Sequence, residues 1–217
     1  MVRDAFQHEM QQVQEVMISM AALVERALAQ ATQALLKRDF ALARTVRSED
    51  AQIDELQRAI RIRCTDVTGR HASGGRDLRE LSVAQLIASE LERMGDHAVG
   101  IAKRTLDMRD DAPPRILGDL GELAKAVMKQ VRAGIEALAT TNEQAAREVC
   151  RGDEAVDTIY KGIRKDVMAY MEAGGEAARI GSSLLFMAHD FERIGDRMTN
   201  ICEDIVYLVT GQIEKLN

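Results

Sequence analysis

Hydrophobic residues recur at intervals of three and four along most of this chain, with polar residues between them. The first run has its apolar positions at Phe6, Met10, Val13, Met17, Met20, Val24, Leu28, Ala31 and Leu35. This spacing places the apolar side chains on one face of an α-helix of about thirty residues, roughly 45 Å long. We therefore predict a long amphipathic helix, which ends at the segment "KRDFA".

Five further runs with the same spacing follow the first. Their apolar positions extend over Val46–Ile60, Ala84–Ile101, Ile116–Leu138, Val149–Ile163 and Leu184–Leu208. The glycine pairs Gly74–Gly75 and Gly174–Gly175 follow the second and fifth runs and are most simply C-caps of the helices before them. Pro113–Pro114 marks the only clear linker. The pattern predicts six long helices and no β-sheet.

The second half of the chain repeats the first. Residues 73–101 and 173–201 align at a constant offset of 100, with ten identical positions. The segments "VRSEDAQIDEL" (46–56) and "VCRGDEAVDTI" (149–159) align at an offset of 103. We therefore predict an all-α fold made of a tandem repeat of two antiparallel three-helix bundles, with residues 1–111 in the first and residues 112–217 in the second.

Each repeat carries two pairs of acidic residues that are four positions apart. The pairs are Asp50/Asp54 and Glu92/Asp96 in the first repeat, and Asp153/Asp157 and Glu192/Asp196 in the second. At this spacing both carboxylates of a pair share one helix face and repel each other by a few tenths of a kcal/mol. A bound cation would relieve the repulsion, and clustered oxygen ligands suit hard cations. On a helical wheel the acids face outward, toward a groove between adjacent helices.

A solvated surface is the alternative interpretation of these acids. Arg93 and Arg193 can each form ion pairs with acids three positions away on their own helix, which for Arg193 are Asp190 and Asp196. His189 lies one turn before Glu192 and is either an additional ligand or an ordinary surface histidine. Gly95 and Gly195 lie within helices, where they permit either a close approach of another helix or access for a metal cluster.

Composition narrows the classes of function. A net charge of −6 and 3% aromatic residues argue against binding of nucleic acid, which favours a basic face and stacking platforms. No apolar run approaches the roughly 20 residues of a membrane-spanning helix, and we see no signal peptide. The scattered cysteines Cys64, Cys150 and Cys202 fit a reducing compartment, so we expect a cytoplasmic protein. The sequence motifs of nucleotide-binding P-loops, zinc proteases and α/β-hydrolases do not occur, which argues against an enzyme of these classes.

The repeated motif resembles the PhoU family over essentially the whole chain. The motif reads [ED]-[LF]-E-R-[MI]-G-D at residues 90–96 and 190–196, and D-x-x-x-D stands on the helix before each copy. The resemblance implies two three-helix bundles whose acidic motifs bind metal ions, in multinuclear clusters, with iron, zinc, manganese and magnesium left open. The implied ligands are Asp50, Asp54, Glu92, Asp96, Asp153, Asp157, Glu192, Asp196 and Asn200. The first repeat departs from the family pattern at Gly100 and Lys103, which makes its site the weaker candidate.

The resemblance also implies a function. PhoU-like proteins are non-enzymatic regulators that act with the phosphate ABC transporter and its sensor histidine kinase, and they keep the Pho regulon off when phosphate is plentiful. By this resemblance we expect a homodimer that associates with the inner membrane through protein partners and binds no nucleic acid. A metal-dependent enzyme acting on phosphate or oxygen and a purely structural helical scaffold remain alternatives.

Overall fold

The computed structural model describes residues 2–71, 74–108, 111 and 116–216. The helices are α1 (Val2–Lys37), α2 (Phe40–His71), α3 (Gly75–Asp107), α4 (Leu117–Thr140), α5 (Glu143–Met171) and α6 (Gly175–Thr210). The described residues contain no strand, so the predicted all-α fold is confirmed. The predicted linker Pro113–Pro114 lies outside the described residues, and the division between residues 111 and 112 stays a prediction.

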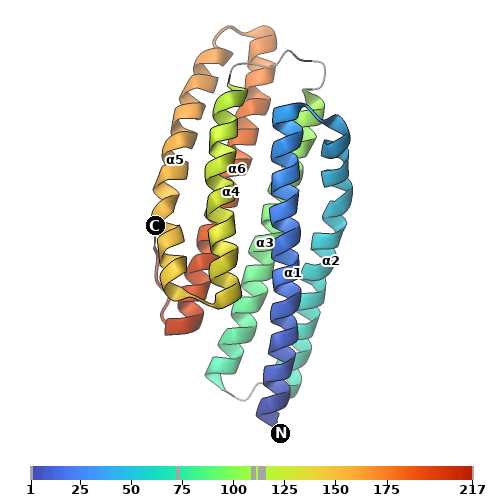
Figure 1. Cartoon of the computed structure of the whole chain (residues 1–217), viewed down its shortest axis with the longest axis vertical. Helices are drawn as coiled ribbons and strands as arrows, with labels where there is room; N and C mark the ends of the chain where they lie inside the picture. Colours follow the sequence, from blue (N-terminus) through green and yellow to red (C-terminus); the bar gives the residue numbers. More distant parts are fainter. Residues whose placement is uncertain (1, 72–73, 109–110, 112–115, 217) are drawn as a thin grey trace.

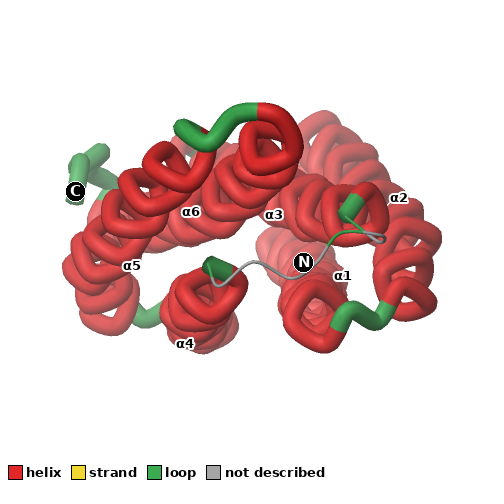
Figure 2. The backbone as a smooth tube through the Cα atoms, turned by 90° about the horizontal axis from the view of Figure 1, so that it is seen from above, coloured by secondary structure: helices red, strands yellow, loops and turns green. Residues whose placement is uncertain are grey.

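The helices form two bundles that lie side by side. Helices α1, α2 and α3 contact one another, as do α4, α5 and α6, and consecutive helices run in opposite directions (Figure 1). Between the bundles, α3 packs against α6 and α1 packs against α4. Seen along the helices, α3 and α6 lie in the middle of the molecule, and α2 and α5 lie at its two flanks (Figure 2). The predicted pair of antiparallel three-helix bundles is therefore confirmed.

The apolar stripes of all six helices meet in one continuous core. Most predicted core positions are buried, and residues such as Met20, Leu91 and Phe191 have no exposed surface. Full burial of a side chain of this size stabilises the fold by about 1.5–3 kcal/mol. The predicted stripe positions Met10, Leu56, Ile159 and Leu208 are only partly buried. No helix in the described part of the chain combines the length and hydrophobicity that a membrane crossing requires.

The second glycine pair lies between α5 and α6. The C-cap of α5 is Glu172, and the Gly174 N–H donates to the carbonyl of Met171 at 3.0 Å just beyond it. Gly174 is also the N-cap of α6, which begins at Gly175, and both residues have positive φ values of 70° and 53° that favour glycine. In the first repeat α3 likewise begins at Gly75. The interpretation as a C-cap is therefore wrong for the second pair, and both pairs begin the helix that follows them.

The contact between α3 and α6 is antiparallel and approximately two-fold symmetric. On α3, Glu90 Oε2 accepts hydrogen bonds from Asn200 at 3.1 Å and from Arg197 at 3.3 Å. On α6, Asp190 occupies the same position of the second repeat and accepts a hydrogen bond from Arg104 at 2.7 Å. Its other carboxylate oxygen lies 3.0 Å from His97 Nδ1. Asp190 therefore pairs across the contact, and the predicted pair with Arg193 on its own helix is wrong.

Two arginines that are identical in the repeats explain part of the similarity. Arg179, near the start of α6, donates a hydrogen bond to Asp111, which follows the end of α3. Arg79, near the start of α3, lies against Gly211 at the end of α6, with its guanidinium 5.7 Å from the ring centre of Tyr207. Each arginine thus places a positive charge beside the C-terminal end of the opposite helix, where the helix dipole favours it.

We predict that Asp190→Ala destabilises the protein by about 2 kcal/mol, because it leaves His97 and Arg104 partly buried without their shared carboxylate. Urea unfolding measures this free energy. The control is Glu122→Ala, which removes an exposed ion pair with Lys125 and should change the unfolding free energy by less than about 0.5 kcal/mol. Equal losses in the two variants would contradict the importance of the α3–α6 contact.

Candidate functional site

The structure brings an acidic residue of α2 or α5 beside the mid-helix glycine of α3 or α6. A Cβ atom on Gly95 would lie 3.0 Å from Ile53 Cδ1 and 3.7 Å from Asp50 Oδ1. A Cβ atom on Gly195 would lie 2.9 Å from Gln130 Oε1 and 3.6 Å from Asp153 Oδ1. Glycine at these positions therefore allows the helices of each bundle to approach closely, which supports the first of the two interpretations.

The four predicted acids of the first repeat form one group, which we call the first acidic cluster. Burial raises the pKa of Asp50, and the charges of Asp54 and Asp96 raise it further. The ammonium group of Lys103 opposes this rise in pKa. Burial also makes the largest contribution to the raised pKa of Glu92, and the charges of Asp96 and Asp54 raise this pKa further. Because these charges act on one another, the four carboxylates lie together along the α2–α3 seam.

The acids of the second repeat form the corresponding second acidic cluster, along the α5–α6 seam. Burial raises the pKa of Glu192 to about 7, and the charge of Asp196 makes the next largest contribution. Asp157 and Asp153 add to the rise in this pKa, whereas Arg193 opposes it. Glu192 Oε2 is buried and has no hydrogen-bond partner among the described residues. The second acidic cluster therefore contains one carboxylate oxygen, Glu192 Oε2, that is buried and accepts no hydrogen bond among the described residues.

One acid does not face outward as the helical wheel predicted. Asp153 is only 7% exposed, whereas its counterpart Asp50 is partly exposed. The Gln130 side chain of α4 donates a hydrogen bond to Asp153 Oδ1 at 2.8 Å, which compensates the carboxylate for lost solvent. The prediction of an outward orientation is therefore wrong for Asp153.

Basic residues of the same helices pair with two acids of the second cluster. Arg193 Nη1 lies 2.6 Å from Asp196 Oδ2, and Lys161 Nζ lies 2.9 Å from Asp157 Oδ2. Within the described ranges, no three His, Cys, Asp or Glu side chains are grouped in a way that could hold a metal ion. The acids therefore share each seam without converging on one point, and their role as metal ligands stays a prediction. Their all-oxygen donor set and the unpartnered Glu192 Oε2 fit a hard cation.

Two further candidate residues have different surroundings. The Asn200 side chain donates to Glu90 across the α3–α6 contact, so its amide nitrogen is engaged outside the second acidic cluster. His189 Nδ1 lies 3.4 Å from Glu192 Oε2, and its side chain is 49% exposed. His189 therefore lies beside the cluster on the surface of the protein.

Sequence reasoning missed one buried and one partly buried polar residue. Gln130 is 7% exposed and lies among the apolar core positions of α4. A polar residue that interrupts an apolar stripe is the sequence signal that could have identified it. Asp204 occupies the position that Arg104 has in the first repeat, so comparison of the repeats could have singled it out. Burial raises the pKa of Asp204 to about 7, and the charges of Glu90 and Glu203 act in the same direction.

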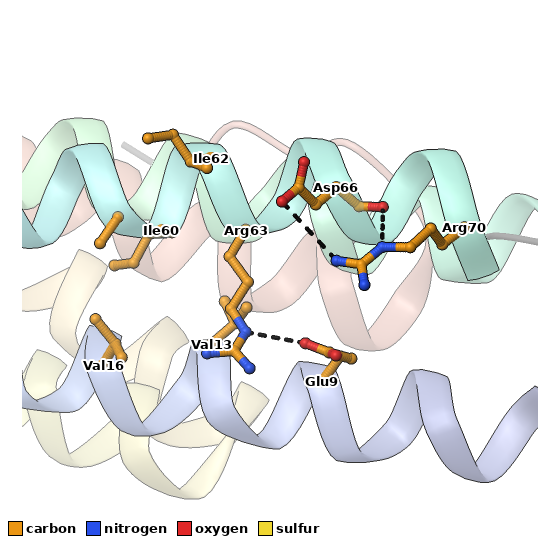
Figure 3. Close-up of a pocket in the computed structure, with 9 residues that line it drawn as sticks. Glu9, Val13, Val16, Ile60, Ile62, Arg63, Asp66 and Arg70 are labelled. Carbon is orange, nitrogen blue, oxygen red and sulfur yellow. Dashed lines mark hydrogen bonds and ion pairs between the residues drawn. The ribbon is translucent and has the colours of Figure 1, made fainter.

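A groove of about 380 Å³ lies away from the acidic clusters, between α1 and α2 (Figure 3). Val13, Val16 and Ile60 line it with apolar surface. At its rim, Arg63 Nε lies 3.0 Å from Glu9 Oε2, and Arg70 pairs with Asp66 on the same helix. None of the predicted site residues lines this groove.

Comparisons with known proteins give a consistent result. The sequence profile of the PhoU domain matches residues 17–105 and 120–205. The chain is 29% identical to a phosphate-specific transport system accessory protein PhoU homolog from Clostridium acetobutylicum, over the whole length of both proteins. It is 31% identical to a PhoU homolog of the same description from Rhizobium meliloti, over 97% of this chain and 89% of that protein. The crystal structure of PhoU from Pseudomonas aeruginosa matches with a TM-score of 0.91 and 30% identity, over 95% of this chain and 100% of that chain.

We predict that the unfolding free energy of the metal-free protein falls as pH rises from about 4 to 7. In this window Asp204 keeps a proton in the folded state, because its pKa is raised from 3.8 to about 7, and loses it on unfolding. Asp204→Asn removes this contribution, so its unfolding free energy should fall less over the window and exceed that of the wild type at pH 8.

Urea unfolding at pH 4, 6 and 8 with a chelator measures the difference between the two proteins. Asp166→Asn, at an exposed position of α5, controls for the substitution itself. Parallel pH profiles of the wild type and Asp204→Asn would contradict the prediction.

Proposed function

The chain belongs to the PhoU family, and we propose from this premise that it is a non-enzymatic regulator of phosphate uptake. The observation that carries the proposal is that both halves of the chain match the PhoU domain, at residues 17–105 and 120–205. The relatives are named as accessory proteins of a phosphate-specific transport system, and one of them matches over the whole length of both chains.

The proposed partners are the phosphate ABC transporter and its sensor histidine kinase. The protein acts on the cytoplasmic side of the inner membrane, as a homodimer, and keeps the Pho regulon off while phosphate is plentiful. The names of the relatives support the link to the transporter. The fold supports an adaptor, because helices of 24 to 36 residues offer long and rigid surfaces for protein partners.

We propose further that the two acidic clusters bind metal ions. The proposed ligands are Asp50, Asp54, Glu92 and Asp96 in the first cluster, and Asp153, Asp157, Glu192 and Asp196 in the second, together with Asn200. A bound cation supplies positive charge that neutralises the mutual repulsion of the carboxylates and links the two helices of a seam. The raised pKa of Glu192 and its buried Oε2 atom, which accepts no hydrogen bond among the described residues, support this role, because both indicate a carboxylate that is poorly compensated for lost solvent.

We predict that deletion of the gene leads to expression of phosphate-scavenging genes even in phosphate-rich medium, because the repressing regulator is lost. A reporter fused to a phosphate-starvation promoter measures this effect. The wild-type gene on a plasmid should restore repression. A matched control, Glu122→Ala with Glu136→Ala, removes two exposed acids from α4 and should restore it as well. Unchanged reporter activity in the deletion strain would refute the assignment for this protein.

We predict that Glu192→Ala with Asp196→Ala lowers the bound metal by about half and leaves the helix content intact. The substitutions remove two ligands and also their mutual repulsion, so the metal-free fold should tolerate them. Glu92→Ala with Asp96→Ala should lower it less, because Gly100 and Lys103 replace the family residues in the first repeat.

Elemental analysis of protein purified without chelator or affinity-tag metal measures the bound metal, and circular dichroism measures the helix content. Equal metal in the wild type and in both double variants would show that the carboxylates form only a solvated surface.

A further inference from the structure

Gln130 of α4 connects the core of the second bundle to its acidic cluster. Its Nε2 atom donates to Asp153 Oδ1 at 2.8 Å and lies 3.3 Å from Thr199 Oγ1 of α6. Gln130 itself is 7% exposed, and its Oε1 atom is buried without a hydrogen-bond partner among the described residues. An amide buried to this extent has little freedom to rotate, so it fixes the carboxylate to which it donates.

The neighbours of Gln130 hold it in this position. Thr199 Oγ1 donates to the carbonyl of Gly195 at 3.2 Å, one turn earlier on α6. Gly195 leaves room for the amide, since a Cβ atom there would lie only 2.9 Å from Gln130 Oε1. Asp153 therefore belongs to a buried polar network that spans α4, α5 and α6.

The first bundle lacks this network at the matching positions. The offset of 103 pairs Gln130 with Ala27, and the offset of 100 pairs Thr199 with Val99. Ala27 and Val99 line a crevice of about 10 Å³ beside Asp50. A crevice of this volume is at the lower limit of what can hold one water molecule. Gln30 of α1 lines the same crevice, but no hydrogen bond joins its amide to Asp50 among the described residues, so Asp50 is not held in the way that Asp153 is.

We propose that Gln130 is a positioning residue that fixes Asp153 for cation binding, and that the second acidic cluster therefore binds a divalent cation more tightly than the first. The inference rests on the proposed function in one respect, that the clusters bind metal at all. A residue that hydrogen-bonds to a metal ligand and orients it changes metal affinity by about 10- to 100-fold, because a ligand held in place loses less freedom on binding.

The experiment isolates the second cluster. The parent protein carries Glu92→Ala and Asp96→Ala, and calorimetry measures its dissociation constant for Mn²⁺. In this parent, Gln130→Ala and Thr199→Val each install the residue that the first bundle has at the matching position. We expect Gln130→Ala to weaken Mn²⁺ binding by about 10- to 100-fold and Thr199→Val to weaken it less. The control Gln144→Ala removes a hydrogen bond to Glu148 at an exposed site of α5 and should leave the dissociation constant unchanged.

Gln130→Met separates the hydrogen bond from packing, because methionine fills a similar volume without an amide. A positioning role predicts the same loss of affinity in Gln130→Met as in Gln130→Ala, whereas a packing role predicts that methionine restores the affinity. The ¹³C signal of the Asp153 carboxyl group in the metal-free protein should shift in both variants. If Gln130→Ala fails to fold, Gln130→Met still tests the proposal.

The outcomes separate this inference from the proposed function. Mn²⁺ binding that is unchanged in Gln130→Ala and Gln130→Met would overturn the role of Gln130 alone. Absence of Mn²⁺ binding in the parent, which retains only the second acidic cluster, would overturn this inference together with the proposed metal site in that cluster. Tighter binding by the isolated first cluster, in a protein with Glu192→Ala and Asp196→Ala, would overturn the predicted order of affinities.

Discussion

The antiparallel contact between α3 and α6 unites the two bundles in one protein. Its apolar residues belong to the continuous core, and polar residues such as Asp190 and Asn200 pair across the contact. Asp190 alone joins α6 to two residues of α3, at 2.7 and 3.0 Å. A buried carboxylate of this kind has to keep its partners, because losing one leaves an uncompensated charge in a region with little water. The contact therefore fixes the register of the two bundles.

The same two helices carry the acidic clusters on another face. On α3, Glu90 and His97 contact α6, whereas Glu92 and Asp96 lie on the seam with α2. Helices α3 and α6 thus each join an acidic cluster on one face to the contact between the bundles on another. Under the proposed function, a cation held by a cluster would contact a helix that also joins the two bundles.

The two repeats have the same arrangement of helices, and they differ in the residues that surround their buried and partly buried carboxylates. In the second bundle, Gln130 and Thr199 surround a buried carboxylate, and Asp204 faces Glu90 with its pKa raised to about 7. In the first bundle the matching positions hold Ala27 and Val99, and Arg104 neutralises Asp190. The two copies of the fold thus retain the same carboxylates and differ in the residues around them, which is the basis for the proposed difference in cation affinity.

The sequence by itself determined the six helices, the repeat and the grouping of the acids along two seams. These features depend on local periodicity and on constant offsets, which a single chain displays directly. The tertiary structure decided which partner each polar side chain has. Asp153 is buried beside Gln130, which lies 23 residues away on another helix and donates to it, and the Asn200 amide donates to Glu90 of the opposite bundle. Helical spacing gives the direction of a side chain from its own axis and carries no information about the neighbour that meets it, so these partners became visible only once the helices were packed together.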